Sequence, residues 1–498
     1  MRPRIQLAAA SAAAALLLSL AQAAFAQDAR PADVPETASR ADEELSADVP
    51  ETASRAEGEL SAEVPETASR AGEARPGGSP PAPGNREADG MTHVVWSKTF
   101  GGTGSDQLES VSATSDGGMI AAGRSTSADG DAEGNQGMSD AWVMKIDRDG
   151  TLQWKRSLGG SREDWASAAI EAPFGGYIVA GGTESSDGDF QEGNGEGELK
   201  TWAASLDENG ETQWLRLILP EREWSADAVI ALSGDGIMIA GTGRDNSDAE
   251  ERCETAPGGP VMIAARTDYD GTVKSSYCRG FPKGPEWPTV ALGTDEKAYA
   301  AYLAYVEDDA ERREPTALEA VGSDGTPLWT APINGPGTKA PGGIVVAGTG
   351  IIGAGSVILT AGEGNWMVPW LFLTGTDGTP HFDAVLEGVP QGRLNSATAA
   401  PGMIFAAGGT RRPGTGPADE GTVNMLVIAA DAVTGTALWS ADLGGSSEDW
   451  ATDVAVLSDE SLVAAGVTDS QDGDLKDRGK NSPGELGGSD GWIVKFRP

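Results

Sequence analysis

The sequence predicts an all-β protein, a seven-bladed β-propeller that follows a signal peptide and a disordered tail. Glycine accounts for 69 of the 498 residues and only 39% of residues are hydrophobic, which is typical of many short strands joined by tight turns. A turn followed by an aromatic strand recurs through the C-terminal four-fifths of the chain. The last repeat ends one strand short, and a segment before the first repeat has the pattern of the missing strand.

The N-terminal residues 1–26 are predicted to be a signal peptide. Arg2 and Arg4 form a positive start, Leu7–Leu20 is an apolar stretch, and Ala24-Phe25-Ala26 matches a cleavage signal. The apolar run is too short to cross a membrane, and no later stretch has the length of a span. We therefore expect an exported protein without a membrane span, placed in the periplasm or outside the cell.

Residues 27–90 are predicted to form a disordered acidic tail. A nine-residue segment recurs with a 15-residue period at Ala32–Arg40, Ala47–Arg55 and Ala62–Arg70, with Glu63 replacing Asp in the third copy, and a Pro/Gly-rich spacer follows at Arg75–Gly84. Such a composition cannot bury a core, so a flexible tether is expected. The alternative is a short helix beginning at the proline of each repeat, which would make the tail a docking motif.

Residues 91–498 contain the longer repeat that predicts the propeller. Its marker is a glycine followed four residues later by tryptophan, and two degenerate copies have Ser275 and Phe382 in place of tryptophan. Counted from Trp96, which lacks the preceding turn, successive markers are 53 to 61 residues apart. A unit of this length with four strand signals suits a propeller blade. The marker tryptophans are predicted to pack between blades: Trp96, Trp154, Trp214, Trp329 and Trp439. Three others, Trp165, Trp224 and Trp450, are expected in the connections between blades, packed at the loop base, with stacking on a sugar as the alternative.

The first repeat shows the four strands of a blade. They are predicted at Ser110–Ser115, Met119–Arg124, Ala141–Asp147 and Thr151–Leu158. The second strand recurs in the later repeats, at Tyr177–Ala180, Ile237–Ala240, Ala298–Ala304, Val357–Thr360, Met403–Ala407 and Leu462–Ala465. Blade seven ends with its third strand, Trp492–Phe496, and His93–Phe100 is predicted to complete it. Pairing the two ends of the domain in one blade removes exposed strand edges and closes the ring.

Two segments resemble known propeller repeats. Trp154–Ser161, followed by Glu163–Ala166, Gly175–Gly182 and Ser186–Asp189, resembles the bacterial secreted propeller repeats known as SBBP or delta-60-like. Separately, Ala429–Trp439 is similar to the tryptophan-docking motif of quinoprotein-like propellers. The resemblance implies a structural tryptophan rather than a quinone cofactor. That fold family includes both non-catalytic outer-membrane assembly factors and dehydrogenases, so it does not decide the function.

Acidic loops between the second and third strands are the candidate binding site. Blades seven, one and two each carry Asp-Gly-Asp there, and ring closure makes these blades neighbours. Carboxylate and amide oxygens suit a hard cation such as calcium, although the spacing is not that of an EF-hand. The alternative is a set of solvated turn acids. The candidate metal ligands are Asp129, Asp131, Asn135, Asp187, Asp189, Asn194, Asp469, Asp472 and Asp474.

The two cysteines, Cys253 and Cys278, are predicted to form a disulfide that pins a long insertion in blade three. The alternative is two separate buried thiols.

The supply of residues favours binding over catalysis. A formal charge of −40 excludes nucleic acid as a partner, and two histidines leave little for a catalytic triad or a zinc site. We therefore expect a non-enzymatic exported propeller that binds a protein or glycan through its loop face, with calcium ordering the loops. The alternative is a carboxylate-dependent hydrolase or lyase, or a quinoprotein-type enzyme, at the central mouth.

Overall fold

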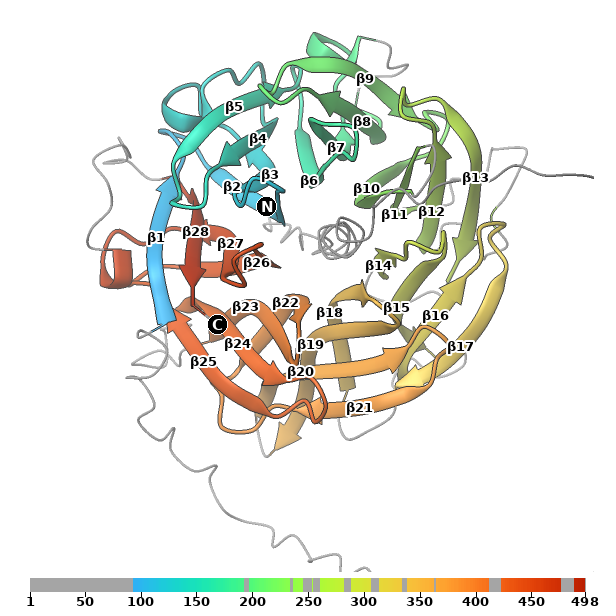
Figure 1. The fold of residues 1–498 in the computed structure, drawn as a ribbon, viewed down its shortest axis with the longest axis vertical. Coiled ribbons are helices and arrows are strands. Elements are labelled where there is room, and N and C mark those ends of the chain that lie inside the picture. The colour runs from blue at the N-terminus through green and yellow to red at the C-terminus, as the bar shows by residue number, and fades with distance from the viewer. Residues whose placement is uncertain are drawn as a thin grey trace, which may run out of the picture.

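The computed structural model is a ring of seven four-stranded antiparallel sheets arranged around a central axis (Figure 1). It confirms the predicted all-β class and the number of blades. The predicted signal peptide and tail, residues 1–90, lie outside the residues that the structure describes. The described residues are 93–191, 197–232, 236–244, 253, 260–281, 288–305, 313–333, 338–361, 364–411, 422–475 and 488–497.

Each blade is a meander whose first strand lies nearest the axis and whose fourth lies at the rim (Figure 1). Blade one contains β2 (Asp106–Ala113), β3 (Met119–Ser125), β4 (Asp140–Ile146) and β5 (Leu152–Leu158); blade two contains β6 (Asp164–Glu171), β7 (Tyr177–Thr183), β8 (Lys200–Leu206) and β9 (Thr212–Ile218). Blade three contains β10 (Trp224–Ala231), β11 (Ile237–Arg244), β12 (Pro260–Thr267) and β13 (Val273–Gly280); blade four contains β14 (Thr289–Leu292), β15 (Ala298–Tyr305), β16 (Arg313–Val321) and β17 (Pro327–Ile333). Blade five contains β18 (Thr338–Ala347), β19 (Gly350–Ala361), β20 (Gly364–Gly375) and β21 (Pro380–Val385); blade six contains β22 (Gly392–Ala400), β23 (Met403–Arg411), β24 (Val423–Asp431) and β25 (Ala437–Leu443).

Blade seven closes the ring in the predicted way. It contains β26 (Asp449–Val456), β27 (Leu462–Thr468), β28 (Asp490–Phe496) and, at the rim, β1 (Val94–Phe100). The blue β1 lies beside the red β28 in Figure 1, and the two strands pair antiparallel from Val94 opposite Phe496 to Phe100 opposite Gly491. The first strand of the domain therefore supplies the outer edge of its last blade.

The innermost strands begin earlier than the alternation pattern predicts. β2 begins at Asp106 rather than at Ser110, because the register with β3 shifts between Leu108 and Ser110. A bulge at this point breaks the alternation of side chains, so the sequence pattern is readable only after it. The prediction that Trp165, Trp224 and Trp450 lie in loops is wrong for the same reason, since they lie in β6, β10 and β26.

The hydrophobic core lies between adjacent blades. One cluster, for example, joins Met119 and Trp142 of blade one to Val463 and Ile493 of blade seven, and all four side chains are buried. Fully burying an aliphatic side chain of this size contributes about 1.5–3 kcal/mol, so packing between the sheets is the main stabilising term. In the described part of the chain, no helix has the length and apolar character needed to cross a bilayer.

Four marker tryptophans also link neighbouring blades by hydrogen bonds. In each case the indole Nε1 donates to a backbone carbonyl in the turn between the third and fourth strands of the next blade. The pairs are Trp96 with Arg148 (3.2 Å), Trp154 with Glu208 (2.9 Å), Trp214 with Tyr269 (2.9 Å) and Trp329 with Thr376 (3.1 Å). Trp439 instead stacks on His93, with ring centroids 4.8 Å apart.

Candidate functional site

The loop between blades one and two is held by side chains of the Asp-Gly-Asp loop beside it. Four consecutive backbone amides of this loop each donate to a side-chain oxygen of blade two. The pairs are Gly159 with Asp189 Oδ2 (3.0 Å), Gly160 with Asp164 Oδ2 (2.8 Å), Ser161 with Asp187 Oδ1 (2.8 Å) and Arg162 with Ser185 Oγ (3.0 Å). In return, the Asp189 amide donates to the Gly159 carbonyl at 2.9 Å. We call this set of hydrogen bonds the loop clasp.

The loop clasp recurs at two more junctions. Between blades six and seven the pairs are Gly444 with Asp474 Oδ2 (3.0 Å), Gly445 with Asp449 Oδ2 (2.8 Å), Ser446 with Asp472 Oδ1 (2.7 Å) and Ser447 with Ser470 Oγ (2.9 Å). Between blades seven and one they are Gly102 with Asp106 Oδ2 (2.7 Å), Thr103 with Asp129 Oδ1 (2.8 Å) and Gly104 with Ser127 Oγ (2.8 Å). A clasped amide keeps a hydrogen-bond partner without any secondary structure in the loop.

One buried aspartate organises each clasp. Asp164 is fully buried, and its two oxygens also accept hydrogen bonds from the hydroxyls of Thr183 and Ser185. Burial raises the pKa of Asp164 above its usual range, against the effect of these hydrogen bonds. Asp106 and Asp449 occupy the same position at the other two junctions and are equally buried.

The glycine pairs of these loops are required by the carboxylates around them. A Cβ on Gly159 would lie 2.3 Å from Asp140 Oδ1, and a Cβ on Gly160 would lie 2.5 Å from Asp187 Oδ1. The glycine of Asp-Gly-Asp is required for another reason. Gly188 has a φ of +61°, in the left-handed region that favours glycine. The motif Gly-Gly-Ser and the motif Asp-Gly-Asp are thus two halves of one structure.

The Asp-Gly-Asp segments form single 3₁₀ turns that an apolar side chain fixes to the blade. η2 (Gly130–Ala132), η3 (Gly188–Phe190) and η4 (Gly473–Leu475) each end on a buried apolar residue. Phe190, for example, is 1% exposed and packs on Trp202 with ring centroids 5.5 Å apart. The acids are therefore held at fixed positions rather than on free loops.

Most of the nine predicted metal ligands take part in the clasp or support it. The side chains of the aspartates at 129, 187, 189, 472 and 474 accept the clasp hydrogen bonds given above. The Asp131 amide donates to the Gly101 carbonyl at 2.8 Å, and Asp469 is exposed beside them. Asn135 bridges the Ser125 carbonyl and the Gly137 amide, each at 2.8 Å. Asn194 lies outside the described residues. Calcium binding by this set stays a prediction.

Two carboxyl groups that the sequence analysis did not select lie behind the clasps. Asp140 and Asp490 begin the third strand of blades one and seven and are buried against the first glycine of the next loop. The recurring sequences Ser-Asp-Ala-Trp at Ser139–Trp142 and Ser-Asp-Gly-Trp at Ser489–Trp492 were the signal that could have revealed them. The pKa of Asp140 is raised to about 6, first by burial, with further contributions from Asp164 and Asp189.

A third buried carboxyl group, Asp453, lies at the ring closure. Its oxygens accept hydrogen bonds from the Val111 amide of blade one (2.8 Å) and the Ser396 hydroxyl of blade six (2.7 Å). Asp453 itself belongs to β26 of blade seven, so it joins three innermost strands. Burial raises its pKa to about 7.

Blades three to five contain different stabilising interactions, within single blades and between blades three and four. Cys253 and Cys278, the predicted pair, form a disulfide across 25 residues of blade three. Buried Glu319 of blade four accepts from Arg279 Nε of blade three at 2.7 Å. In blade five, buried Lys339 forms an ion pair with Asp383 and lies 5.0 Å from the ring of Trp370.

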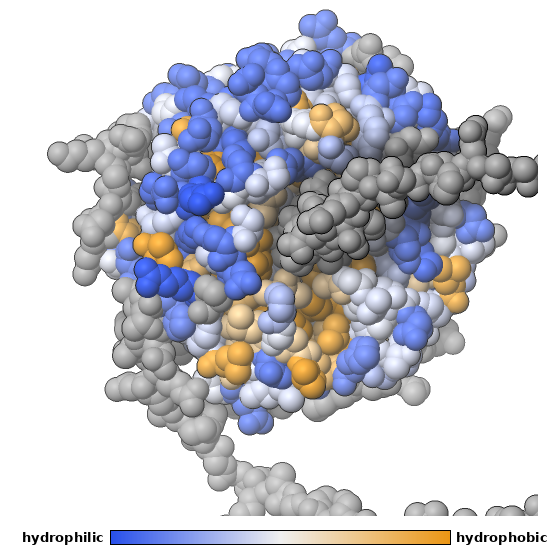
Figure 2. Space-filling model, in the orientation of Figure 1, coloured by the Kyte–Doolittle hydropathy of each residue, from blue (hydrophilic) through white to orange (hydrophobic). Residues whose placement is uncertain are grey.

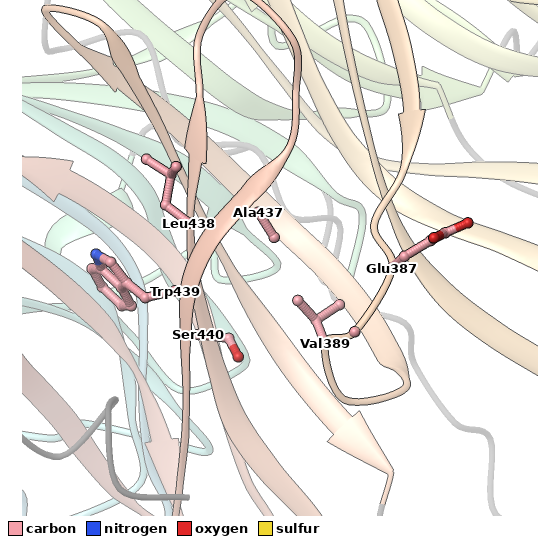
Figure 3. Close-up of a pocket in the computed structure, with 7 residues that line it drawn as sticks. Glu387, Val389, Ala437, Leu438, Trp439 and Ser440 are labelled. Carbon is pink, nitrogen blue, oxygen red and sulfur yellow. The ribbon is translucent and has the colours of Figure 1, made fainter. Parts of the chain in front are cut away.

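A shallow pocket lies between blades five and six (Figure 3). Its lining consists of Glu387, Gly388, Val389, Ala437, Leu438, Trp439 and Ser440. Figure 3 shows the carboxylate of Glu387 pointing away from Val389 and Ala437. This pocket therefore offers one carboxylate, directed outward, and no second acid beside it.

The surface differs in character around the ring. On the face shown in Figure 2, hydrophilic residues gather over blades one and two, whereas hydrophobic residues are concentrated toward the axis at blades five and six. The hydrophilic part agrees with the overall excess of 76 acidic over 36 basic residues.

Comparison with known proteins finds solved structures that are similar in fold, but no family or curated protein that matches in sequence. No protein-family model matches the chain, and no curated protein matches it. Among solved structures, BamB from Moraxella catarrhalis is 13% identical with a TM-score of 0.38, covering 81% of this chain and 99% of its own. The quinohemoprotein alcohol dehydrogenase from Comamonas testosteroni is 9% identical with a TM-score of 0.39, covering 83% and 77%. Sqt1 from Chaetomium thermophilum is 12% identical with a TM-score of 0.41, covering 81% and 99%.

Proposed function

We propose that this protein is an exported, non-enzymatic propeller that binds a basic segment of a partner protein through the loop face of blades seven, one and two. The observation that carries the proposal is the loop clasp. It fixes exposed carboxylates, such as those of Asp187, Asp189 and Asp472, on a rigid ring. Preorganised charge of one sign attracts a partner of the opposite sign and needs little ordering on binding. The relation to SBBP repeats and the ordering of these loops by calcium belong to the same proposal.

The positions of the perturbed acids support a non-enzymatic role. Asp453 and Asp140, whose pKa values are raised to about 7 and about 6, are both fully buried. A catalytic acid or base must reach a substrate within hydrogen-bond distance. Both groups are instead enclosed: Asp453 accepts hydrogen bonds from blades one and six, and Asp140 lies buried against Gly159.

Binding to a lysine-rich peptide tests this proposal. The whole chain is passed over an immobilised lysine-rich peptide, with a glutamate-rich peptide and an uncharged oligosaccharide as the other probes, and binding is measured by biolayer interferometry at low and high salt. The loop-face variant carries Glu133→Gln, Glu163→Gln and Glu448→Gln, three acids outside the clasp hydrogen bonds. The matched control carries Asp149→Asn, Glu208→Gln and Glu460→Gln, three acids in turns at the opposite ends of the strands.

We expect salt-sensitive binding of the lysine-rich peptide, weakened several-fold in the loop-face variant and much less in the control. Equal weakening in both variants would mean that net charge alone attracts the peptide, and the proposed face would be wrong. Binding of the oligosaccharide alone would replace the protein partner by a glycan.

A further inference from the structure

We propose that a hard cation, for which Ca²⁺ is the best chemical match, binds at the junction between blades one and two, held by the carboxylates of Asp140 and Asp164 with Asp189 at the rim. This deepens the calcium part of the proposed function, because it moves the cation from the tips of the Asp-Gly-Asp loops to a buried carboxyl pair behind the clasp.

The first observation is an oxygen without a partner. Asp140 is fully buried, and its Oδ2 accepts hydrogen bonds from the Gln136 amide (3.0 Å) and the Ser157 hydroxyl (3.2 Å). Its Oδ1 is buried and has no hydrogen-bond partner. A buried carboxylate oxygen left in this state is costly, and a cation would supply the missing interaction.

The second observation is the direction of this oxygen. Oδ1 lies against Gly159, within 2.3 Å of the place a Cβ would occupy, and the next amide, Gly160, donates to Asp164. The two carboxyl groups therefore both lie at the same glycine pair. Asp189, which receives the Gly159 amide, is the exposed third acid of this group.

The third observation is the pattern of residues at the equivalent junctions. The residue in the position of Asp140, opposite the last or near-last residue of the second strand, is Lys200, Asn424 or Asp490 in other blades. Where Lys200 replaces it, Trp224 stands in the position of Asp164, so both acids are absent together. Lys200 is satisfied by Glu198 at 3.0 Å. Between blades six and seven, Asn424 takes the place of Asp140 while Asp449 is kept, so among these junctions only seven–one and one–two carry both carboxyl groups.

The coordination shell would be shared between protein and solvent. Within the described residues, no three His, Cys, Asp or Glu side chains form a complete metal-binding group. Calcium takes six to eight oxygen ligands and accepts backbone carbonyls and waters among them. The chain would thus supply two carboxylates, and carbonyl or water oxygens would complete the shell.

The test measures calcium binding to the whole chain by isothermal titration and by the calcium-dependent rise in melting temperature, with magnesium as the control for screening. Asp140→Asn should fold, because Asn424 already occupies this position between blades six and seven. We expect Asp140→Asn to lose one calcium site, or to weaken it at least about tenfold. Its melting temperature in chelator should equal or exceed that of the wild type.

The reverse variant creates the carboxyl pair elsewhere. Asn424→Asp places a second carboxylate opposite Asp449, whose Oδ2 lies 2.4 Å from a Cβ on Gly444, with Asn424 Oδ1 at 3.1 Å from the same point. We expect this variant to gain one calcium site. Failure to gain a site would overturn the claim that the carboxyl pair holds the cation.

The outcomes separate this inference from the proposed function. Unchanged calcium binding in Asp140→Asn overturns the inference. If binding is then lost in Asp129→Asn or Asp472→Asn, the loop-tip prediction stands in its place. If the wild type binds no calcium at millimolar concentration, both calcium ideas fail, while peptide binding by the loop face can still be observed.

Discussion

Two parts of the ring are stabilised by different kinds of interaction. At the junctions six–seven, seven–one and one–two, the irregular connection between blades is held by a repeated loop clasp made of glycine, serine and aspartate. From blade three to blade five the features are single ones: a disulfide within blade three, the Arg279–Glu319 ion pair between blades three and four, and the buried Lys339–Asp383 pair within blade five. An interaction that occurs at several junctions needs the same residues at each of them, so it appears as a repeat in the sequence. An interaction that occurs once leaves no such repeat. The clasp motifs are therefore recognisable as a repeat in the sequence, whereas the ion pairs of blades three to five are not.

The largest expected effect comes from removing the central acid of a clasp. Asp449→Ala leaves the Gly445 amide and the hydroxyls of Thr468 and Ser470 without their acceptor. We expect the free energy of unfolding to fall by about 3–5 kcal/mol. Chemical denaturation measures the change, with Glu448→Ala as the neighbouring control, for which we expect less than about 0.5 kcal/mol. A loss below about 1 kcal/mol for Asp449→Ala would show that the clasp contributes little.

The corresponding test in blades three to five removes the disulfide of blade three. Replacing both Cys253 and Cys278 with serine should lower the free energy of unfolding by about 3 kcal/mol, since the bridge closes a loop of about 25 residues. Denaturant melts of the wild type with and without reductant provide the comparison. If the double variant and the reduced wild type are as stable as the oxidised protein, blade three does not depend on the disulfide.

Asp453 gives the ring closure a dependence on pH. Its pKa in the folded protein is raised to about 7, above the value of about 3.9 for an unfolded chain. The folded state therefore keeps a proton that the unfolded state has lost. The stabilisation that Asp453 gives to the folded state is greatest below pH 4. Between pH 4 and pH 7 the free energy of unfolding falls by up to about 1.4 kcal/mol per pH unit. Above pH 7 Asp453 causes no further change.

Replacing Asp453 with asparagine should remove this slope. Denaturation of the wild type and of Asp453→Asn between pH 5 and pH 8 measures it, because other titrating groups are common to both proteins. The difference between their free energies of unfolding should change steadily up to about pH 7. A constant difference across this range would mean that Asp453 is ionised throughout, contrary to the expectation from its burial.

The smallest expected effect lies at the exposed edge of the clasp. The side chain of Asp472 accepts one hydrogen bond among the described contacts, from the amide of Ser446, and Asp472 is exposed. Asp472→Ala should cost about 1 kcal/mol, well below the effect of Asp449→Ala. Equal effects of the two variants would place the strength of the clasp at its rim rather than in its buried acid.

The sequence predicted the architecture because the propeller repeats its pattern. The glycine–tryptophan marker and the incomplete last blade sufficed to predict seven blades and the role of β1. The starts of the innermost strands were missed, since the bulge after Leu108 hides the alternation in β2. The Asp-Gly-Asp and Gly-Gly-Ser motifs were noticed separately. Their union in one clasp depends on contacts between segments about 25 residues apart, such as Ser161 with Asp187, which local patterns do not contain.

The clasp itself is tested most directly by amide hydrogen exchange. The account predicts slow exchange in peptides that cover the loops 101–104, 159–162 and 444–447, although none of these segments is a strand. The connection between blades five and six, residues 387–391, lacks the Gly-Gly pair and should exchange much faster. Asp164→Ala should release protection at 159–162 alone. Rapid exchange of all four connections in the wild type would contradict the clasp.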